Sequence, residues 1–525
     1  MSRARDVASN NLALINPTSD GNLLTASSGA WVSQAPAPAP PSGNQVEMVA
    51  SGTLADGSAV ILQSDGTVKV PTGVAGGELS KQTIQATNST LITGSCFHTG
   101  QNKIVISYCD NSNSTHGMLV AGTISGDTIT FGTPITFNAG YTNNSSLAYH
   151  AQADRIVVVY EDSVSQYGTF RTYSLSGTTF TASVGATRLN STESMGNMVC
   201  QYDPDQQCVV VFWRRISVGN AGGVMALTVT SNSAGTNSIG NYGNGVVTQN
   251  KCAYNTTLDH HLVIYKDSNN SSYLHYSVYT ASGTTLTRHT EGLIYSGSAD
   301  QHDLGYDPDS DRMLVFASLS SLNSEGHIIV GTASGNSYGW TTPSANTSRV
   351  SLFQELAQAC QIIHNPDTQQ MICIWQGTDN AGSTFAQDGR IAAVTVSGTT
   401  ITAGTPQTWN TGYIDQIDPI YDTNADRLAV AYRDQANSNH IFGSILKLSS
   451  TDLTTSNFLG FSNGAYTNGQ TATIQTTGNV DDAQTGLVIG STYFVQNDGT
   501  LATTASPLVS VTAGKAIAAT KILIA

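Results

Sequence analysis

The sequence predicts an all-β protein built around a seven-bladed β-propeller, with small flanking β modules and an extended N-terminal arm. Two observations predict this architecture. Charged residues make up only 11% of the chain and 50 of its 525 residues are glycine, a composition typical of strands joined by turns. Apolar runs that end in an aromatic residue also recur through the middle of the chain, at a period of roughly 50 residues, which is the length of a propeller blade.

The repeat is visible as two series of positions that keep a fixed spacing. The aromatic ends of the apolar runs lie 52, 53, 52, 51, 59 and 57 residues apart, at Tyr108, Tyr160, Trp213, Tyr265, Phe316, Trp375 and Tyr432. A second series precedes the first by 10 or 11 residues each time, at His98, Tyr149, Tyr202, Tyr254, Tyr306, His364 and Tyr421. Because both series keep the same order and offset, we interpret them as seven repeats of one structural unit.

Each repeat is expected to fold into four antiparallel strands. The Tyr/His position ends a first strand, and a polar turn such as residues 307–311 leads to the apolar run. The apolar run is the second strand, continuous in Val, Ile and Leu because both of its faces are buried. After a looser third strand, a Ser-Gly turn leads to the fourth; this turn is found at residues 125–128, 176–179, 282–285 and 397–400.

The seventh repeat has no Ser-Gly turn and no fourth strand after its third strand at residues 441–446. The first repeat, in contrast, is preceded by a spare extended segment, residues 79–85. We therefore expect residues 79–85 to supply the outer strand of the blade that contains Tyr432. Such a closure removes the two open sheet edges that a linear array would expose.

The segments that flank the repeats define the remaining domains. Both flanks carry an Asp-Gly pair between apolar segments, at residues 60–68 and 493–501, which predicts a β-hairpin with a two-residue turn in each. These modules are expected to lie beside the ring and to pack together. The predicted divisions are an N-terminal anchoring arm (1–34), a Pro/Ala-rich linker (35–44), a β-hairpin module (45–77), the propeller (78–447) and a C-terminal β module (448–525).

Charge and cysteine content restrict the class of function. The net charge of −15 argues against nucleic acid as a partner, since a phosphate backbone requires a basic surface. No 18 apolar residues run together, so no membrane insertion is expected, and the N-terminus lacks the apolar core of a signal peptide. The seven cysteines are odd in number and form no C-x-x-C pair, which favours a protein made in a reducing cytoplasm.

Acidic residues near the predicted channel are the candidate catalytic groups. Propeller enzymes that act on glycans place paired carboxylates there, and the corresponding positions are Glu193, His302, Asp303, Glu355, Asp415 and Asp418. The sequence has no Ser-x-Asp-x-Gly-x-Thr-Trp box and no evident arginine triad. We therefore interpret these groups as solvated acids that line a wet channel, and assign no catalytic residue.

Four further features have simpler structural interpretations, so no metal or cofactor is assigned. Asp307, Asp309 and Asp311 alternate as in a calcium loop, but sister turns carry Gln206, Gln207, Gln369 and Gln370, which favours hairpin capping. His260–His261 lacks a third ligand and is expected at a polar turn. Arg214–Arg215 is expected at a solvated strand end. The aromatic residues that end the apolar runs are expected in the core between blades.

Two segments resemble tailed-phage virion proteins, in particular those of marine cyanophages. Residues 21–36 contain GNLLT and GAWVSQAP, and resemble a phrase found near the ends of tail-fibre modules. The C-terminal part contains NFLGF, DDAQTGL, YFVQNDGTL and AGKAIAATK, and resembles a module that recurs in cyanophage structural proteins. These segments cover about a fifth of the chain. The resemblance implies a virion component and carries over no functional residue.

Together these observations predict a non-enzymatic virion protein of a tailed phage, made in the host cytoplasm. It would be a tail fibre or appendage, oligomeric in the virion, attached to other virion proteins through residues 1–34 and contributing to attachment to a host-surface polysaccharide. The alternatives are a purely structural capsid decoration or tail-tube component, and a glycan-degrading propeller enzyme.

Overall fold

In the computed structural model the chain is all-β, and its described part contains no α-helix, only the short 3-10 turns η1 (Asn111–Asn113) and η2 (Ser320–Leu322). None of the described residues belongs to a helix with the length and apolarity needed to cross a membrane. The structure describes residues 23–27, 30–34, 44–74, 76–86, 91–162, 165–190, 192–230, 234–236, 240–243, 245–344, 348, 356–378, 387–448, 450–506 and 509–525.

The chain divides into two compact units. Residues 75–449 form the larger one, and residues 1–74 together with 450–525 form the smaller. The smaller unit is therefore made of two segments that are far apart in the sequence. The Pro/Ala-rich linker at residues 35–41 lies outside the described residues, as do residues 1–22.

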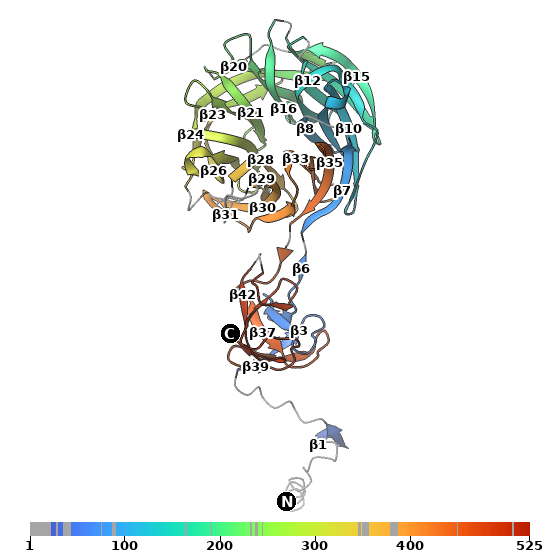
Figure 1. The fold of residues 1–525 in the computed structure, drawn as a ribbon, viewed down its shortest axis with the longest axis vertical. Coiled ribbons are helices and arrows are strands. Elements are labelled where there is room, and N and C mark those ends of the chain that lie inside the picture. The colour runs from blue at the N-terminus through green and yellow to red at the C-terminus, as the bar shows by residue number, and fades with distance from the viewer. Residues whose placement is uncertain are drawn as a thin grey trace, which may run out of the picture. The chain divides into compact units, whose positions relative to one another are not determined.

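The larger unit repeats one antiparallel pattern from β8 to β35, and the arrangement is β-propeller-like (Figure 1). The first strands of the repeats are β8 (Leu91–His98), β12 (Ile135–His150), β16 (Met195–Asp203), β21 (Val247–Asn255), β24 (Thr285–Asp307), β28 (Leu356–Asn365) and β33 (Ile414–Asp422). The second strands are β9 (Lys103–Asp110), β13 (Arg155–Asp162), β17 (Cys208–Arg215), β22 (His260–Asp267), β25 (Arg312–Leu319), β29 (Gln370–Thr378) and β34 (Arg427–Asp434).

Each second strand pairs with a third strand, which in turn pairs with short outer strands. The third strands are β10 (His116–Ser125), β14 (Tyr167–Ser176), β18 (Gly222–Val229), β23 (Tyr273–Ser282), β26 (Glu325–Ser334), β30 (Gln387–Ser397) and β35 (His440–Lys447). The outer strands include β11 (Thr128–Phe131), β15 (Thr179–Arg188), β19 (Ala234–Thr236), β20 (Gly240–Tyr242), β27 (Ser337–Trp340), β31 (Thr400–Ala403) and β32 (Gln407–Asn410). The predicted Ser-Gly turns join the third strands to outer strands, and residues 334–337 form a further turn of this kind.

The hydrogen-bonded sheets do not correspond one to one with the repeats. β8–β15 form one sheet of eight strands, and β21–β32 form one of twelve. The merging follows from the long strands β12 and β24: each begins as an outer strand of one repeat and continues as the first strand of the next. Among the described residues, a single strand pair, Glu325 with Leu356, links the fifth and sixth repeats.

The prediction that residues 79–85 complete the last repeat is confirmed. β7 (Gly77–Gln85) pairs antiparallel with β35, from Gly77 opposite Lys447 to Gln85 opposite Ile441, in a four-stranded sheet with β33 and β34. In Figure 1 this blue strand lies beside the orange strand β35. Apolar residues of β7 and of the last repeat share a core with the first repeat, which includes Ile84, Ile104 and Ile445.

The apolar second strands are buried on both faces, as predicted. In β13, Ile156, Val158 and Tyr160 pack toward the preceding repeat, whereas Val157 and Val159 pack toward the following one. The aromatic residues that end these runs are all buried core residues. Burying one such side chain is worth about 1.5–3 kcal/mol, so these interfaces provide much of the stability of the unit.

Two positions of the predicted series are out of register by one residue. In the first repeat Phe97, and not His98, occupies the place of Tyr149, because His98 is the strand end that pairs with Lys103. In the fifth repeat Ala317 occupies the aromatic place, and Phe316 packs toward the following repeat instead of the preceding one. Residue spacing alone does not reveal such a shift, although it moves the side chain to the other face of the strand.

In the smaller unit, residues from both ends of the chain form one barrel. β3 (Gln45–Ala50), β4 (Ala59–Leu62) and β5 (Thr67–Lys69) close with β37 (Phe458–Ser462) and β38 (Thr471–Gln475). A second sheet contains β39 (Val480–Asp481), β40 (Thr492–Val495), β41 (Leu501–Ala502), β42 (Val511–Ala518) and β43 (Lys521–Ile524). Two short pairs complete the unit: β6 (Gly73–Val74) with β36 (Ser450–Thr451), and the hairpin of β1 (Leu23–Ser27) with β2 (Ala30–Gln34).

The two Asp-Gly hairpins form, as β4–β5 and β40–β41, but their loops are longer than predicted. Gln63 N donates to Thr67 O (2.8 Å) and Gln496 N to Thr500 O (2.7 Å), so each loop has three residues instead of two. The glycines, Gly66 and Gly499, take the left-handed conformation (φ 83° and 82°), which places a bulge after the turn. The Asp side chain accepts from the Thr two residues later in both loops.

Candidate functional site

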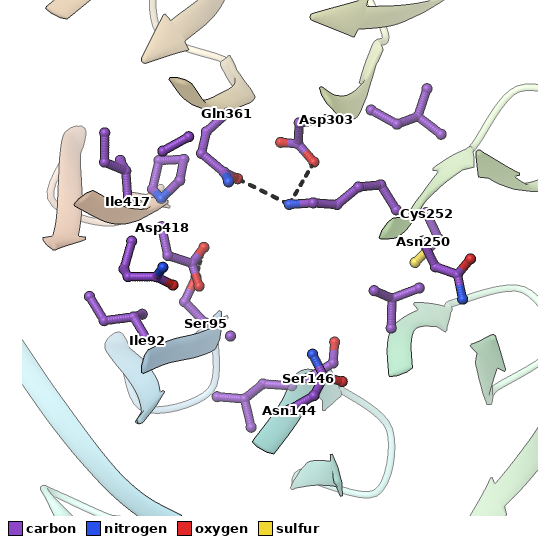
Figure 2. A pocket seen from close by; sticks show the side chains of 18 of the residues that line it. Ile92, Ser95, Asn144, Ser146, Asn250, Cys252, Asp303, Gln361, Ile417 and Asp418 are labelled. Atoms are coloured by element: carbon purple, nitrogen blue, oxygen red, sulfur yellow. Dashed lines mark hydrogen bonds and ion pairs between the residues drawn. The ribbon is translucent and has the colours of Figure 1, made fainter. Parts of the chain in front are cut away.

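A central cavity of about 500 Å³ lies among the first strands of the larger unit. Residues of all seven first strands line it, and each of these strands contacts the next, with β33 contacting β8. Figure 2 shows Asp303, Gln361, Asp418 and Asn144 around this space. The cavity is therefore built from the same part of each repeat, where the side chains differ from strand to strand.

An ion pair crosses the cavity. Lys251 Nζ lies 3.2 Å from Asp303 Oδ1, and it donates to Gln361 Oε1 at 3.5 Å. The other carboxylate oxygen of Asp303 accepts from the backbone N of Ile362 (3.0 Å). Burial opposes the charge on Lys251, but the carboxylates of Asp303 and Asp418 outweigh it and raise the pKa of the ammonium. Asp303 is thus held by a cation and by the backbone.

Asp418 is the second acid of the cavity. Its Oδ1 accepts from Ser95 Oγ at 3.0 Å. Burial raises the pKa of Asp418 to about 6, although Lys251 and the Ser95 hydroxyl act in the opposite direction. Near neutral pH this group changes its charge within a cavity that holds one fixed ion pair.

Neutral polar side chains line other parts of the wall. Asn143, Asn144 and Ser146 come from β12, and Asn250 comes from β21. The Nδ2 of Asn250 donates to Asn197 O (2.9 Å), whereas its buried Oδ1 has no hydrogen-bond partner among the described residues. Because buried acceptors are nearly always hydrogen-bonded, Asn250 Oδ1 is suited to accept a hydrogen bond from a donor in the cavity.

A smaller side cavity of about 200 Å³ shares Gln301, Ala359 and Gln416 with the central cavity. Asp415 belongs to this second space: its carboxylate is bound by Arg433, with Nε 2.7 Å from Oδ1, and by Gln435. Tyr413 lies at its edge with 41% of its surface exposed.

The predicted acids therefore separate into distinct places. Asp303 and Asp418 line the central cavity, and Asp415 lines the side cavity. His302 is buried behind Asp303 with Nε2 2.8 Å from Gln249 O, and burial together with Lys251 lowers its pKa to about 3. Glu193 lines neither cavity, and Glu355 lies outside the described residues.

Two predicted surface positions are wrong. Arg215 is not a solvated strand end, because its guanidinium forms an ion pair with the nearly buried Glu193, with Nε 2.9 Å from Oε2. His260 and His261 are not at a polar turn: both are buried at the start of β22. His261 contacts Asp203 through Nε2 (2.8 Å) and Gln201 through Nδ1 (2.8 Å).

The polar turns after the first strands share one geometry. The last residue of each first strand accepts from backbone N–H groups two or three residues later; these residues are His98, His150, Asp203, Asn255, Asp307, Asn365 and Asp422. The residue four positions after each cap is left-handed, with φ of 52–55°, at Asn102, Asp154, Gln207, Asp259, Asp311, Gln369 and Asp426. Side-chain capping therefore shapes all of these turns, as was predicted from the sequence for the turn at Asp307.

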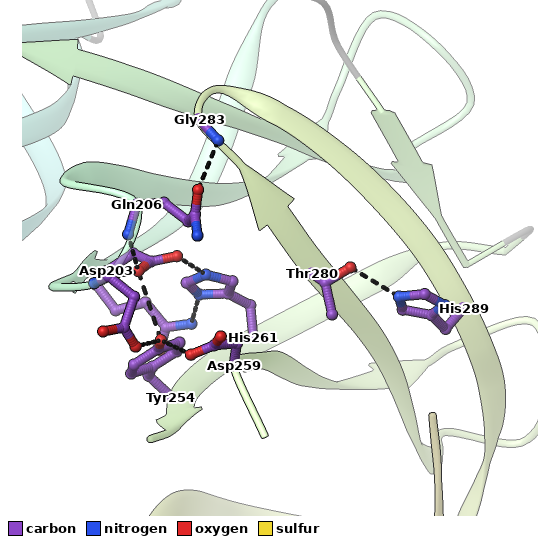
Figure 3. Close-up of polar contacts among 10 residues, drawn as sticks. Asp203, Gln206, Tyr254, Asp259, His261, Thr280, Gly283 and His289 are labelled. Atoms are coloured by element: carbon purple, nitrogen blue, oxygen red, sulfur yellow. Dashed lines mark hydrogen bonds and ion pairs between the residues drawn. The ribbon is translucent and has the colours of Figure 1, made fainter. Parts of the chain in front are cut away.

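Tyrosines add a second contact to several of these turns. In Figure 3, Tyr254 and Asp259 lie together beside Asp203 and His261. Tyr254 OH donates to Asp259 Oδ1 (2.7 Å), and burial and the surrounding carboxylates raise its pKa well above the usual range. The same contact joins Tyr149 to Asp154 and Tyr306 to Asp311, each at 2.9 Å.

One turn cluster has the composition of a metal site. Ligand atoms of Asp307, Asp309 and His364 lie within 4.8 Å of one another. Asp309 contacts His364 Nε2 (2.7 Å) and Gln369 Nε2 (3.2 Å), while Asp307 caps its own turn. These oxygens already have protein partners, so we assign no ion to this cluster.

Sequence reasoning missed Lys251 and the glutamines of the side cavity. Neither belongs to a motif. Alignment of the repeats on their strand ends would have indicated Lys251, because it occupies the position of Asp303, Gln361 and Asp418.

Comparisons with known proteins add no family assignment. No protein-family model matches the chain. No curated protein matches it either.

Among solved structures, the chain is similar to the BP39L lectin from Burkholderia pseudomallei (11% identity, TM-score 0.44), covering 69% of this chain and 100% of that one. It is also similar to a protein of unknown function from Dyadobacter fermentans (11% identity, TM-score 0.41), covering 71% of this chain and 98% of that one. A third similarity is to the periplasmic gluconolactonase PpgL of Pseudomonas aeruginosa (10% identity, TM-score 0.41), covering 70% of this chain and 96% of that one.

Proposed function

We propose that the chain is a non-enzymatic virion component of a tailed phage that contributes to attachment to a host-surface glycan. In this proposal residues 75–449 are a closed seven-bladed β-propeller, in which the first strands surround the central cavity. The proposal rests on the resemblance of residues 21–36 and of the C-terminal part to phage structural proteins, and on the chemistry of the cavity.

The observation that favours binding over hydrolysis is the state of the carboxylates. A glycosidase uses two carboxyl groups free to exchange protons and to reach a sugar carbon. Here Asp303 is paired with Lys251, and Asp415 with Arg433. Amide and hydroxyl groups make up much of the wall, and such groups can hydrogen-bond to sugar hydroxyls without catalysing a reaction.

The experiment for this function uses purified protein and host-surface polysaccharide. We expect retention of the chain on immobilised polysaccharide, with no reducing sugar released after prolonged incubation. The triple variant Asp303→Asn, Asp415→Asn, Asp418→Asn removes the carboxylates that a hydrolase would use, and it is the control for any release of sugar. Release of reducing sugar that the triple variant abolishes would replace the proposal by a glycan-degrading enzyme.

The enzyme alternative is favoured by one observation. Asp418, with a pKa raised to about 6, is protonated often enough near neutral pH to serve as a general acid. It lacks a free carboxylate partner, because Asp303 is bound by Lys251 and by the backbone of Ile362.

Attachment to the virion is assigned to residues 1–34, of which the hairpin of β1 and β2 is described. A short segment without a core of its own gains order by docking on a larger partner. Truncation of residues 1–34 should give a folded protein that no longer enters particles. Normal incorporation of this truncation would favour the alternative of a purely structural capsid or tail-tube component.

A further inference from the structure

We propose that the side cavity is the glycan subsite of this protein and that it binds one neutral sugar residue. This inference rests on the proposed glycan attachment and assigns it a place. The cavity volume of about 200 Å³ lies below the 300 Å³ or more typical of sites for drug-sized ligands, so it suits a single ring.

The wall of this cavity is rich in primary amides. Six glutamines from β24, β28, β29, β30, β33 and the end of β34 line it: Gln301, Gln358, Gln376, Gln387, Gln416 and Gln435. A carboxamide offers two donors and one acceptor without charge, which matches a sugar hydroxyl that both donates and accepts. Such convergence from separate strands is not explained by packing, because glutamine is usually a solvated residue.

Some of these amides are fixed, and others are open to a ligand. Gln376 is buried, at 3% exposure, and its Nε2 donates to Gln387 Oε1. In contrast, the side chains of Gln301, Gln358 and Gln416 make no hydrogen bond to another described residue. The cavity therefore combines one hydrogen-bonded amide pair with amide groups that have no partner among the described residues.

Tyr413 supplies the apolar surface that a pyranose ring requires. Tyr413 lines the cavity and is 41% exposed as a residue, and its backbone is held because Gln435 N donates to Tyr413 O at 2.8 Å. An aromatic face beside hydrogen-bonding groups is amphipathic in the same way as a sugar, which has C–H and O–H faces.

The charge of the cavity selects against acidic sugars. Asp415 is neutralised by Arg433, and no lysine or arginine is among the described lining residues. An anionic sugar would therefore meet no free cation, in a chain whose net charge is −15. A neutral hexose or N-acetylhexosamine meets no such penalty.

Backbone strain also occurs at this cavity. Ala359 and Gln416, which line both cavities, have φ of 47° and 52° at bulges in β28 and β33. A left-handed alanine costs about 1 kcal/mol or more, and bulges commonly re-aim side chains beside functional sites. The bulges place Gln358 and Gln416 on the wall of the side cavity.

The test measures binding of four sugars to the full chain by saturation-transfer difference NMR. The sugars are D-glucose, D-galactose, N-acetyl-D-glucosamine and D-glucuronate. We expect binding of at least one neutral sugar and at least about tenfold weaker binding of glucuronate. Tyr413→Ala and Gln358→Ala should each weaken the neutral sugar about five- to tenfold. The matched controls are Tyr141→Ala, since Tyr141 is 48% exposed and lines neither cavity, and Gln152→Ala in a distant turn.

Absence of binding by all three neutral sugars, equal binding of glucuronate, or equal effects of the control variants would overturn the inference. The outcome is separable from that of glycan attachment. If the chain binds host polysaccharide and Tyr413→Ala leaves that binding unchanged, the subsite assignment fails while the attachment function stands. If monosaccharide binds at Tyr413 but host polysaccharide does not, the function fails instead.

Discussion

The two ends of the first strands differ in regularity. At the turn end, each of the seven strands stops at a side-chain cap and continues through a left-handed residue of nearly constant φ. At the cavity end, every first strand departs from regular pairing, and the aligned side chains range from Gly94 through Lys251 to Asp418. Uniform geometry with interchangeable Asp, Asn and His is what stability requires, whereas divergent side chains on a common scaffold are what recognition requires.

The largest effect at the turn end is expected from removing the Asp203 cap, which makes several hydrogen bonds. Asp203 is fully buried, caps two backbone N–H groups and contacts His261 Nε2, so Asp203→Ala should destabilise the protein by about 3 kcal/mol. The free energy of unfolding from denaturant titration measures this. Asp205→Ala, two residues later on the exposed side of the same turn, is the control and should leave the midpoint close to that of the parent. Equal effects of the two would contradict the structural assignment of the caps.

The histidine caps test whether the seven turns are equivalent. His150 accepts from Ala153 N through Nδ1 (3.1 Å) and contacts Gln207 O through Nε2 (3.0 Å). His150→Ala should cost about 2 kcal/mol, and His150→Asn should recover about half of this because asparagine restores the cap but not the second contact. If asparagine were no better than alanine in thermal unfolding, the capping equivalence would be wrong.

At the cavity end, Asp418 should make stability fall with rising pH. Its pKa in the folded chain is about 6, above the ordinary 3.8, so the folded state binds more protons than the unfolded state between these values. The parent protein should lose about 1 kcal/mol of its free energy of unfolding between pH 4 and 7, and Asp418→Asn should remove this loss. The loss is smaller than the pKa shift alone implies, because solvent screening weakens the electrostatic effect. Melting temperatures of both proteins across this range measure the difference, which Lys251→Met should enlarge. Parallel curves would refute the assignment.

The smallest expected effect has the opposite sign. Ala359 is left-handed, so Ala359→Gly should stabilise the protein by about 0.5 kcal/mol as relief of strain outweighs the flexibility of glycine. Ala357→Gly, in regular conformation on the same strand, should destabilise it by about 1 kcal/mol. Denaturant titrations of the two variants give the comparison, and a destabilising Ala359→Gly would mean that the bulge is not strained.

The regular features of the molecule were predictable from the sequence. Apolar second strands, Ser-Gly turns and the β7 closure follow from local patterning and from counting strands. The register at His98 and Phe316 was not predictable, because a shift of one residue leaves the spacing almost unchanged but reverses the face of the strand.

The candidate site was predictable only in part. Asp303, Asp415 and Asp418 were identified because carboxylates are the expected catalytic groups of a propeller channel. The ion pairs of Asp303 with Lys251 and of Asp415 with Arg433 join residues 18 or more positions apart, so no local pattern indicates them. The glutamines of the side cavity come from five strands and from the residue that follows β34, and no local pattern distinguishes them from solvated glutamines. The two flanking modules were expected to pack together, but their closure into one barrel was not predictable, because it pairs residues as distant in the sequence as Val46 and Ile474.

The strand pairs at the boundary of the larger unit give it the connectivity of an exchangeable insert. Val74 is the register partner of Ser450, and Gly77 that of Lys447, so the chain leaves the smaller unit and returns to it through neighbouring strands. Excision of residues 75–449 would leave two ends that are already matched, and another domain with adjacent termini could be spliced between them. A gene with this layout can exchange its larger unit by recombination at two points while the remainder of the protein keeps its own strand pairing.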